Sequence, residues 1–533
     1  MLAALSPEIR SAIEAALPGY LKRQRWFAGK ARSLTAVSVD EAVMLPGPRP
    51  AALLMVLVRY GNESSETYLL CAAQGTRAHA ETPVLARCGG VVLCPGLTEP
   101  WVRGCLFHAI RSGRTFPGEH GSVSGEPPST WPATPVHEDR TPGSAILRTE
   151  QSNTSLVFGE RWIMKFFRRL EPGVNPELEM CRALSSQSAF TRTPRLGGTL
   201  TYRPEAGEPL TLAVLQGFVP NRGDAWTYSL AEARRFLDGS PEEDSLHNGS
   251  YLKSARLLGR RVAELHLALS RITNDPAFRP EPFTLQSLRR LRGSMRDRAR
   301  TALGLLREGN LPTELRADAE GLLAREGEVR SRFEELPGAG KGLLRIRVHG
   351  DLHLGQILYT GDDFYIIDFE GEPARPLAER RAKESPLRDA AGMLRSFEYA
   401  AQAALRDRTA PARERAALES RARAWGAAAG KEFLDEYRSV LAGTPLFPQR
   451  AARLLDAFLL DKALYELAYE LNNRPTWVSA PLRGVLDILA GGCASCPPRS
   501  PARSGKPKLT HAGVRPLQRS TAARSKPRAT GTR

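Results

Sequence analysis

The segment VHGDLHLGQILYTGDDFYIIDFE, from Val348 to Glu370, decides the fold class of this chain. It contains a His-x-Asp loop, an amide five residues after the aspartate, a short strand, a Gly-Asp turn and a second strand ending in Asp-Phe. Because a hairpin brings its two ends together, Asp351, Gln356 and Asp368 can converge on one site. Asp351 can accept the proton of a substrate hydroxyl, and Gln356 and Asp368 offer the hard oxygen ligands that Mg²⁺ requires. This ordered set predicts half of an ATP-dependent phosphoryl-transfer site.

A second half of the site is predicted upstream, in the strand-like run RWIMKFFRR from Arg161 to Arg169. Lys165 lies in the middle of this apolar run, and a lysine there must reach solvent or find an anionic partner. In kinases, a strand lysine pairs with a helix glutamate and is held against the α- and β-phosphates of ATP. The position of Lys165 upstream of the Asp351 motif fits that order.

The partner of Lys165 is predicted on the next helix. Asn175, followed by a proline, makes a good N-cap and first turn for a helix that runs to about residue 186. This helix carries Glu177 and Glu179. We take Glu179 as the partner, although the sequence does not settle the choice between the two.

Two more segments are predicted to contact ATP. The polar loop from Gln151 to Thr154 would cover the phosphates through backbone N–H groups and hydroxyls, in place of the usual glycines. The run TLAVLQGFVP after Leu210 would be a strand leading to the hinge, whose backbone groups bind adenine in kinases. The residues assigned to ATP beside Lys165 and Glu179 are Ser152, Asn153, Thr154, Gln216 and Phe218.

The composition is that of an ordinary soluble globular protein. Of 533 residues, 42% are hydrophobic and 25% are charged. The N-terminal stretch has no basic start followed by an apolar core, so no signal peptide is expected. The longest apolar run, Ala51 to Val58, is too short to cross a bilayer. We therefore expect a cytoplasmic protein without a membrane partner.

The net charge of +17 comes largely from the C-terminal tail. From Pro497 to Arg533 there are ten Lys or Arg residues and no Asp or Glu, so this tail contributes +10. Its Pro, Ser, Ala and Thr content predicts that residues 493–533 are disordered. A solvated tail explains the charge, so we assign it no role and do not expect a nucleic-acid-binding protein. Cys493 and Cys496 form a lone CxxC without the second pair of a zinc site, and we expect reduced thiols there.

The expected elements divide the chain into regions of different class. A helix over residues 7–21 and strands over 37–45, 53–60 and 67–72 predict a small α+β module that ends near residue 90. The Gly-, Pro- and Ser-rich stretch over 99–140 predicts only a short helix near 101–110 and a mobile connection. Two long helices are expected over 288–335, and more helices over 387–489. The second half is therefore predicted to be a helical lobe that the catalytic hairpin interrupts.

Four blocks of the sequence resemble one known family. They are LPGYLKRQRWFAGKAR (17–32), EQSNTSLVFGERWIMKFFRRLEPGVNPELEM (150–180), HGDLHLGQILYTGDDFYIIDFEGEPARPLAERRAKESPLRDAAGMLRSFEYAA (349–401) and YELAYELNNRPTWVSAPLRGVLDIL (465–489). They resemble the maltokinase family, aminoglycoside-phosphotransferase-like kinases that make maltose 1-phosphate from ATP and maltose. The resemblance implies an α+β, bilobal protein-kinase-like fold with an N-terminal α+β cap domain and a mostly helical C-lobe.

The resemblance also implies where the domains lie. The cap domain would span residues 1–90, and a connecting segment 91–144. The ATP-binding N-lobe would span 145–220, and the C-lobe 221–490, with its catalytic hairpin at 348–370. The basic tail over 493–533 lies outside the family pattern.

Roles for single residues follow from the same resemblance. Asp351 would be the base that activates the anomeric hydroxyl of maltose, and Gln356 and Asp368 would hold Mg²⁺. Lys165 would contact the phosphates of ATP, with Glu179 as its brace. The residues expected to form the sugar pocket are Glu370, Glu372, Arg380, Arg381, Lys383, Tyr469, Asn473, Arg474 and Trp477.

The resemblance predicts a maltokinase, with maltose, ATP and Mg²⁺ as its small molecules. Such a kinase feeds glycogen or α-glucan synthesis from trehalose, and a trehalose synthase would be a separate partner. One alternative is a glucosamine, aminosugar or aminoglycoside kinase of the same fold. The prominent Arg and Lys residues after Glu370 argue mildly against a polycationic aminoglycoside, whereas glucosamine is harder to exclude. A different class, an inactive kinase-like binding module, would have no reason to keep Lys165, Asp351, Gln356 and Asp368 together.

Overall fold

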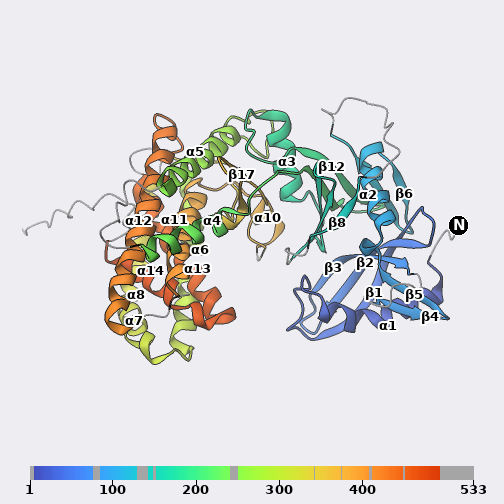
Figure 1. Cartoon of the computed structure of the whole chain (residues 1–533), viewed down its shortest axis with the longest axis horizontal. Helices are drawn as coiled ribbons and strands as arrows, with labels where there is room; N and C mark the ends of the chain where they lie inside the picture. The colour runs from blue at the N-terminus through green and yellow to red at the C-terminus, as the bar shows by residue number, and fades with distance from the viewer. Residues whose placement is uncertain are drawn as a thin grey trace, which may run out of the picture. The chain divides into compact units, whose positions relative to one another are not determined.

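The computed structural model describes ten stretches of the chain: residues 5–75, 84–128, 142–147, 152–239, 250–340, 342–373, 375–406, 408, 411–447 and 451–491 (Figure 1). Three of the expectations above concern residues outside these stretches: Gln151, the thiols of Cys493 and Cys496, and the basic tail.

The N-terminal part is a helix packed on an antiparallel sheet (Figure 1). Helix α1 (Pro7–Arg23) begins at Ser6, whose hydroxyl accepts the N–H of Ile9. The sheet order is β1-β2-β3-β5-β4. Its strands are β1 (Leu34–Leu45), β2 (Ala51–Tyr60), β3 (Ser65–Gln74), β4 (Ala86–Cys88) and β5 (Val91–Pro95). The predicted helix and three strands of this module are confirmed.

Strand β2 is apolar almost throughout because both of its faces are covered. Leu54 and Val56 are buried in one cluster with Leu17 of α1. Leu53 lies in another cluster with Leu106 of α2 (Pro100–Ser112). Successive residues of a strand point to opposite faces, so a strand covered on both sides loses the usual polar alternation.

A seven-stranded sheet follows, in the order β6-β7-β12-β13-β10-β9-β8. Its first strands, β6 (Thr115–Pro117) and β7 (Gly121–Glu126), lie in the stretch that was predicted to be a mobile connection, and that prediction is wrong there. Their Gly, Ser and Pro residues have low strand propensity, so the sequence does not predict strands here. Pairing of β7 with β12 stabilises the strand conformation instead. The other strands are β8 (Ser144–Ile146), β9 (Thr154–Phe158), β10 (Trp162–Phe166), β12 (Leu196–Pro204) and β13 (Leu210–Gly217).

The two sheets are joined by a short strand. Strand β11 (Arg169–Leu170) follows β10 and pairs antiparallel with β3 of the first sheet. Helix α3 (Pro176–Gln187) comes next and is capped as predicted, since the Asn175 side chain accepts the N–H of Glu177 at 2.8 Å. The strand that carries Lys165 is therefore continuous in sequence with a strand held by the first sheet.

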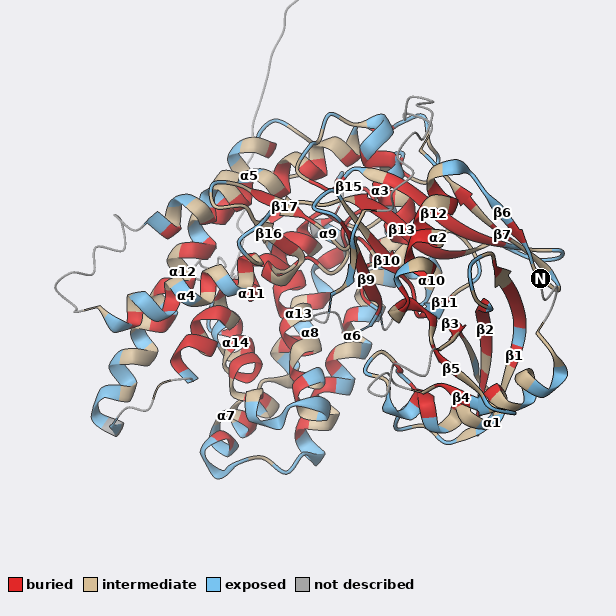
Figure 2. Cartoon of the chain, turned by 45° about the vertical axis from the view of Figure 1, so that its right-hand side comes forward, coloured by how far each residue is buried: buried red, intermediate tan, exposed pale blue. Residues whose placement is uncertain are grey.

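The second half of the chain is helical (Figure 1). Its core is one buried cluster that joins α5, α11, α12 and α13, and Figure 2 shows buried residues along α11 and α13. Residues 288–335 form three helices instead of the predicted two. The helices are α4 (Ala225–Asp238), α5 (Ser250–Ser270), α6 (Leu285–Glu308), α7 (Thr313–Ala324), α8 (Glu326–Glu334), α9 (Leu336–Ala339), α10 (Leu377–Arg380), α11 (Leu387–Arg406), α12 (Ala412–Leu441), α13 (Ala451–Asn473) and α14 (Ser479–Leu489).

A small hairpin interrupts these helices. Strands β16 (Ile357–Tyr359) and β17 (Phe364–Ile366) pair antiparallel, and the hairpin packs on α4 and α5. A second pair, β14 (Glu281–Pro282) with β15 (Leu344–Arg345), lies just before it in the chain. Among the described residues, none of the helices is both long and apolar enough to pass through a bilayer.

Candidate active site

The hairpin brings the predicted catalytic residues together. Ile357 pairs with Ile366, and the Ile367 N–H donates to the Gln356 carbonyl at 3.0 Å. Asp351, Gln356 and Asp368 line one cavity as a result. We call it the nucleotide-side cavity; its other lining residues include Trp26, Ala28, Ser152, Asn153, Glu370 and Arg380.

A buried carboxylate that the sequence analysis missed holds the catalytic loop. Asp389 of α11 accepts the backbone N–H groups of His349 and Gly350 at 2.8 and 2.9 Å. Its Oδ2 also lies 3.1 Å from Nε2 of His266. Gly350 has φ of 86°, a conformation that favours glycine. Asp389 therefore fixes the turn from which Asp351 projects.

Asp351 lies between two cavities. Besides the nucleotide-side cavity it lines a second one, where Nζ of Lys462 is 3.4 Å from its Oδ1. Burial raises the pKa of Asp351, but the charge of Lys462, with that of His353, outweighs it and holds the pKa below its ordinary value. Asp351 is therefore ionised at neutral pH and able to accept a proton.

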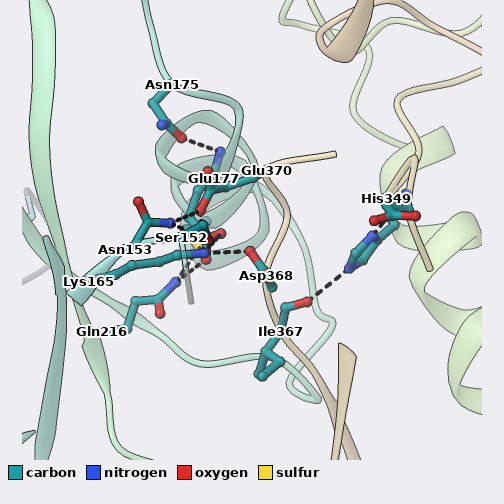
Figure 3. A network of polar contacts seen from close by, with 12 residues as sticks. Ser152, Asn153, Lys165, Asn175, Glu177, Gln216, His349, Ile367, Asp368 and Glu370 are labelled. Carbon is teal, nitrogen blue, oxygen red and sulfur yellow. Dashed lines mark hydrogen bonds and ion pairs between the residues drawn. The ribbon is translucent and has the colours of Figure 1, made fainter. Parts of the chain in front are cut away.

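Lys165 is surrounded by three carboxylates (Figure 3). Its Nζ lies 2.5 Å from Asp368 Oδ1, 2.5 Å from Glu370 Oε1 and 3.4 Å from Glu177 Oε2. The choice of Glu179 as the partner was wrong. Residues two apart on a helix point to different sides, so only one of the two glutamates can face the strand lysine.

Glu179 neutralises arginines instead. Its carboxylate lies 2.5 Å from Arg347 and 2.8 Å from Arg381. Arg347 is only 1% exposed, so it needs a buried counter-charge. Burial raises the pKa of Glu179, but hydrogen bonding to Arg381 and the charge of Arg347 lower it below its ordinary value.

The carboxylates around Lys165 could hold a divalent cation. Oxygen atoms of Glu177, Asp368 and Glu370 lie within 4.8 Å of one another. Burial raises the pKa of Glu370 to about 7, against the charge of Lys165 and with support from that of Asp368. One lysine cannot balance three acids, and hard oxygens are the ligands that Mg²⁺ prefers. The donor set, with Gln356 on the same cavity, fits Mg²⁺, and it includes Glu370, which was predicted to bind sugar.

The loop before β9 lies at the carboxylates around Lys165. Ser152 and Asn153 line the nucleotide-side cavity, and Asn153 Nδ2 donates to Glu370 Oε1 at 2.7 Å. Thr154 is the first residue of β9, and its hydroxyl accepts from Arg168 at 2.9 Å. The predicted contact of these three residues with ATP stays a prediction.

The predicted hinge residues have other partners. Gln216 is buried, and its Nε2 donates to Glu177 Oε1 at 2.8 Å, so its side chain braces the glutamate that faces Lys165. The N–H of Phe218 donates to the carbonyl of Arg161 at 2.8 Å, so this N–H is not available to adenine in this structure. Sequence analysis could not predict this network because its members lie far apart in the sequence, Gln216 on β13 and Glu177 on α3.

In the second cavity, which we call the acceptor-side cavity, each carboxylate has a cationic partner. Arg298 holds Asp461 with two hydrogen bonds, at 2.8 and 2.7 Å. Glu372 lies 2.8 Å from Arg375 and 3.0 Å from Arg388. Its remaining lining residues are Gly350, Asp351, Leu352, Gly392, Phe458, Lys462 and Tyr465. Of this set, sequence analysis had predicted only Asp351 and Glu372.

A groove between α6 and α13 continues from this cavity. It shares Arg298 and Tyr465 with the acceptor-side cavity. The groove is shallow and open to solvent, whereas the inner cavity is small, about 30 Å³. Its other lining residues are Arg290, Gly293, Ser294, Asp297, Thr301 and Ala468.

Most of the predicted sugar residues lie elsewhere. Arg380 lines the nucleotide-side cavity and contacts Glu171. Arg381 binds Glu179, and Lys383 binds Glu281 at 2.6 Å. In the described part of the chain, six of the predicted residues line neither cavity nor the groove: Arg381, Lys383, Tyr469, Asn473, Arg474 and Trp477.

The residues at the end of α13 interact with one another instead. Arg474 binds Glu470 at 2.7 Å, and Asn473 donates to the Tyr469 carbonyl at 2.9 Å. The Trp477 ring is stacked near Tyr399, and the Arg406 guanidinium lies 3.7 Å from its centroid. The aromatic rings that line the acceptor-side cavity are those of Phe458 and Tyr465, earlier on the same helix.

Comparisons with known proteins agree with this architecture. Residues 20–92 match a model of the maltokinase N-terminal cap domain, and residues 145–425, more than half of the chain, match a model of the phosphotransferase enzyme family. The chain belongs to the phosphotransferase enzyme family. The predicted resemblance to maltokinases, in a cap domain followed by a phosphotransferase domain, is confirmed.

Two curated relatives are named glucosamine kinases. One, from Streptacidiphilus jiangxiensis, is 29% identical over 351 residues, which cover 65% of this chain and 74% of that protein. The other, from Mycolicibacterium smegmatis, is 28% identical over 359 residues, which cover 66% and 81%. A solved glucosamine kinase in complex with glucosamine, ADP and inorganic phosphate has a TM-score of 0.62 at 24% identity, covering 91% of this chain and 100% of that one. The predicted α+β, bilobal fold with a cap domain is confirmed.

Proposed function

We propose that this phosphotransferase moves the γ-phosphoryl group of Mg·ATP to the anomeric hydroxyl of maltose. The observation that carries the proposal is the position of Asp351 on the wall between two cavities of different charge. On one side lie Lys165 and Asp368, and on the other lies a cavity with paired charges. A base at such a boundary can take a proton from an acceptor on one side while a phosphate approaches from the other.

The nucleotide side provides charge for the phosphates. Lys165 would bind them, with Glu177 and Gln216 holding the lysine strand against α3. Asp368, Glu370 and Gln356 would hold Mg²⁺, which neutralises charge on the transferred group when bound. Glu370 lies 2.5 Å from the Lys165 amine. If the phosphates bind to this amine, they must displace the Glu370 carboxylate from it. A convergent set of this kind argues against an inactive binding module.

The acceptor side favours a neutral sugar. Each of its three carboxylates has a cationic partner: Lys462 for Asp351, Arg298 for Asp461, and two arginines for Glu372. An ammonium group would need an unpaired carboxylate to replace its hydration, because burying an unpaired charge is unfavourable. Glucosamine is the acceptor named for the curated relatives and is therefore the principal rival, yet this cavity offers its amine no free acid among the described residues.

The groove favours an acceptor larger than one ring. Asp351 lies in the small inner cavity, and Tyr465 and Arg298 lead from there into the open groove. The Lys462 amine lies 3.4 Å from Oδ1 of Asp351, so an acceptor hydroxyl would approach the carboxylate beside it, and Lys462 would remain the partner of Asp351. Maltose would bring its anomeric hydroxyl to Asp351 through the inner cavity, with its rings extending outward into the groove.

The wider role rests on the resemblance to maltokinases. The product, maltose 1-phosphate, would feed α-glucan or glycogen synthesis, with trehalose as the original source of the maltose. A trehalose synthase would then be the partner that supplies maltose, in the cytoplasm where ATP is available.

The experiment that tests the proposal is ADP release, coupled to a reporter enzyme, with Mg·ATP and maltose, glucose, glucosamine, trehalose or kanamycin. Reactions without acceptor and with excess chelator are the controls. We expect turnover with maltose to exceed that with the other acceptors and to stop with the chelator. Preferred turnover of glucosamine would leave the kinase assignment standing and overturn the acceptor.

A further inference from the structure

The segment that follows helix α1 forms part of the wall of the nucleotide-side cavity. Trp26 and Ala28, just after α1, line this cavity together with Ser152, Asn153 and Asp368. The cap domain is thus part of the wall of the site, although it belongs to a different sheet from the loop before β9.

One arginine connects Trp26 with that loop. The Arg168 guanidinium lies 4.9 Å from the Trp26 ring, within the range of a cation–π contact. Its Nε donates to the Thr154 hydroxyl at 2.9 Å, and its backbone N–H donates to Oδ1 of Asn153 at 3.3 Å. Arg168 is buried, so its geometry is set by these neighbours. Of the three described loop residues assigned to the ATP phosphates, Thr154 is thus held by the Arg168 side chain and Asn153 by its backbone N–H.

The cap also fixes the other end of this connection. The N–H of Leu69 in β3 donates to the Arg168 carbonyl at 2.8 Å, and the Arg168 side chain donates to the Leu69 carbonyl at 3.3 Å. Tyr68, the neighbour of Leu69, lies 6.0 Å from the Trp26 ring. The indole and the guanidinium are thus both placed by strand β3.

The connection continues to the catalytic lysine. Asn153 donates to Glu370, and Glu370 lies 2.5 Å from Lys165. A shift of the Arg168 backbone would change the position of Asn153 directly, whereas a shift of its guanidinium would act on Thr154, the chain neighbour of Asn153. None of these contacts involves the acceptor-side cavity.

We propose that Trp26 is a positioning residue for the nucleotide phosphates: its indole holds the Arg168 guanidinium, which in turn holds the Thr154 hydroxyl and so fixes the start of β9, next to Asn153, in the geometry that the phosphates need. The proposal rests on the proposed function, because it assumes that the loop before β9 contacts ATP. It makes the cap a determinant of nucleotide affinity and leaves acceptor affinity untouched.

Nucleotide binding without acceptor tests this most directly. The titrant is the Mg complex of a non-hydrolysable ATP analogue, measured by calorimetry on the full chain. Loss of a desolvated cation–π contact predicts that Trp26→Ala weakens binding by about tenfold. Trp101→Ala is the matched control, since Trp101 is a tryptophan of α2 that packs against Gly47 of the cap and not against Arg168, and it should leave the Kd unchanged.

A double-mutant cycle shows whether Trp26 acts through Arg168. If it does, the Trp26→Ala/Arg168→Ala variant binds the analogue no more weakly than Arg168→Ala alone. Additive losses would overturn the proposal. Kinetics give a second readout: KM for ATP should rise in Trp26→Ala while KM for maltose stays constant.

The outcomes separate this inference from the proposed function. If the wild-type chain does not bind the analogue, the ATP assignment itself fails. If the wild type binds and Trp26→Ala binds equally well, only the positioning role fails. Trp26→Phe keeps the packing on Tyr68 and serves if the alanine variant does not fold; a weaker cation–π contact predicts a loss of about two- to threefold, and an unchanged Kd would overturn the proposal.

Discussion

The two cavities that meet at Asp351 differ in how their charges are balanced. On the nucleotide side, Glu177, Asp368 and Glu370 face one lysine, so negative charge is in excess. On the acceptor side, every acid among the described lining residues has a basic partner. Excess carboxylate attracts a metal ion that accompanies phosphates, whereas a balanced site suits a ligand made of hydroxyls. In the proposed reaction, this difference in charge pairing would separate the ionic substrate from the neutral one.

The strongest test of this boundary removes its base. Asp351→Asn keeps the shape of the side chain but cannot accept a proton, so we expect kcat to fall by about 10³-fold. Calorimetric binding of the ATP analogue should change little, because Asp351 is expected to act on the acceptor hydroxyl and not to bind the phosphates or Mg²⁺. Asp362→Asn is the control: this residue lies in the same hairpin, is exposed and bonds only locally, to Thr360 at 2.9 Å. Near-normal turnover of Asp351→Asn would contradict the account.

The nucleotide side is tested by the two glutamates of α3. Glu177→Gln removes one charge beside Lys165, and we expect KM for ATP to rise by about tenfold. Glu179→Gln should instead leave this KM unchanged and lower the free energy of unfolding by about 3 kcal/mol, because Arg347 loses its buried counter-charge. Thermal unfolding and steady-state kinetics on both variants test these expectations. A higher KM for ATP in Glu179→Gln, with an unchanged KM in Glu177→Gln, would make Glu179 the partner of Lys165.

Charge pairing on the acceptor side predicts a change in selectivity. Arg298→Met leaves Asp461 without its partner, so a free carboxylate appears beside the acceptor. We expect the ratio of kcat/KM for maltose to that for glucosamine to fall by about tenfold. The Arg298→Met/Asp461→Asn variant removes both charges and should recover the ratio. If the ratio stays constant in the single variant, paired acids do not determine the acceptor.

The smallest expected effect is a shift in pH dependence. Burial alone would raise the pKa of Asp351, and the charge of Lys462 is the main influence that keeps it low. Asp351 works when ionised, so Lys462→Met should raise its pKa and move the acid limb of kcat/KM upward by about one pH unit. Lys431→Met, which removes an exposed lysine paired with Asp435, should leave the profile in place. A downward shift in Lys462→Met would contradict the assignment.

Local sequence patterns predicted the hairpin and the helix cap on the nucleotide side correctly. The hairpin that joins Gln356 to Asp368 and the Asn175 cap of α3 are contiguous, so their geometry follows from neighbouring residues. Choosing between Glu177 and Glu179 failed because it depends on the rotation of α3 against β10, which tertiary packing decides.

The acceptor side was largely missed for a different reason. Lys462 lies 111 residues from Asp351 in sequence, and Arg298 meets Asp461 across 163 residues. Helices of the C-lobe carry many charges, and no local signal distinguishes those that face a cavity from those that face solvent. Trp477 and its neighbours stood out by residue type, yet helix packing turns them away from Asp351 and toward Tyr399 and Arg406.

The most direct test of the central claim is a competition between maltose and glucosamine at equal concentration with limiting Mg·ATP, followed by ³¹P NMR of the products. We expect the main product to be a maltose phosphate whose phosphorus couples to the anomeric proton and whose phosphate is released by mild acid. A main product of acid-stable glucosamine phosphate would contradict the claim that the paired charges beside Asp351 select a neutral disaccharide.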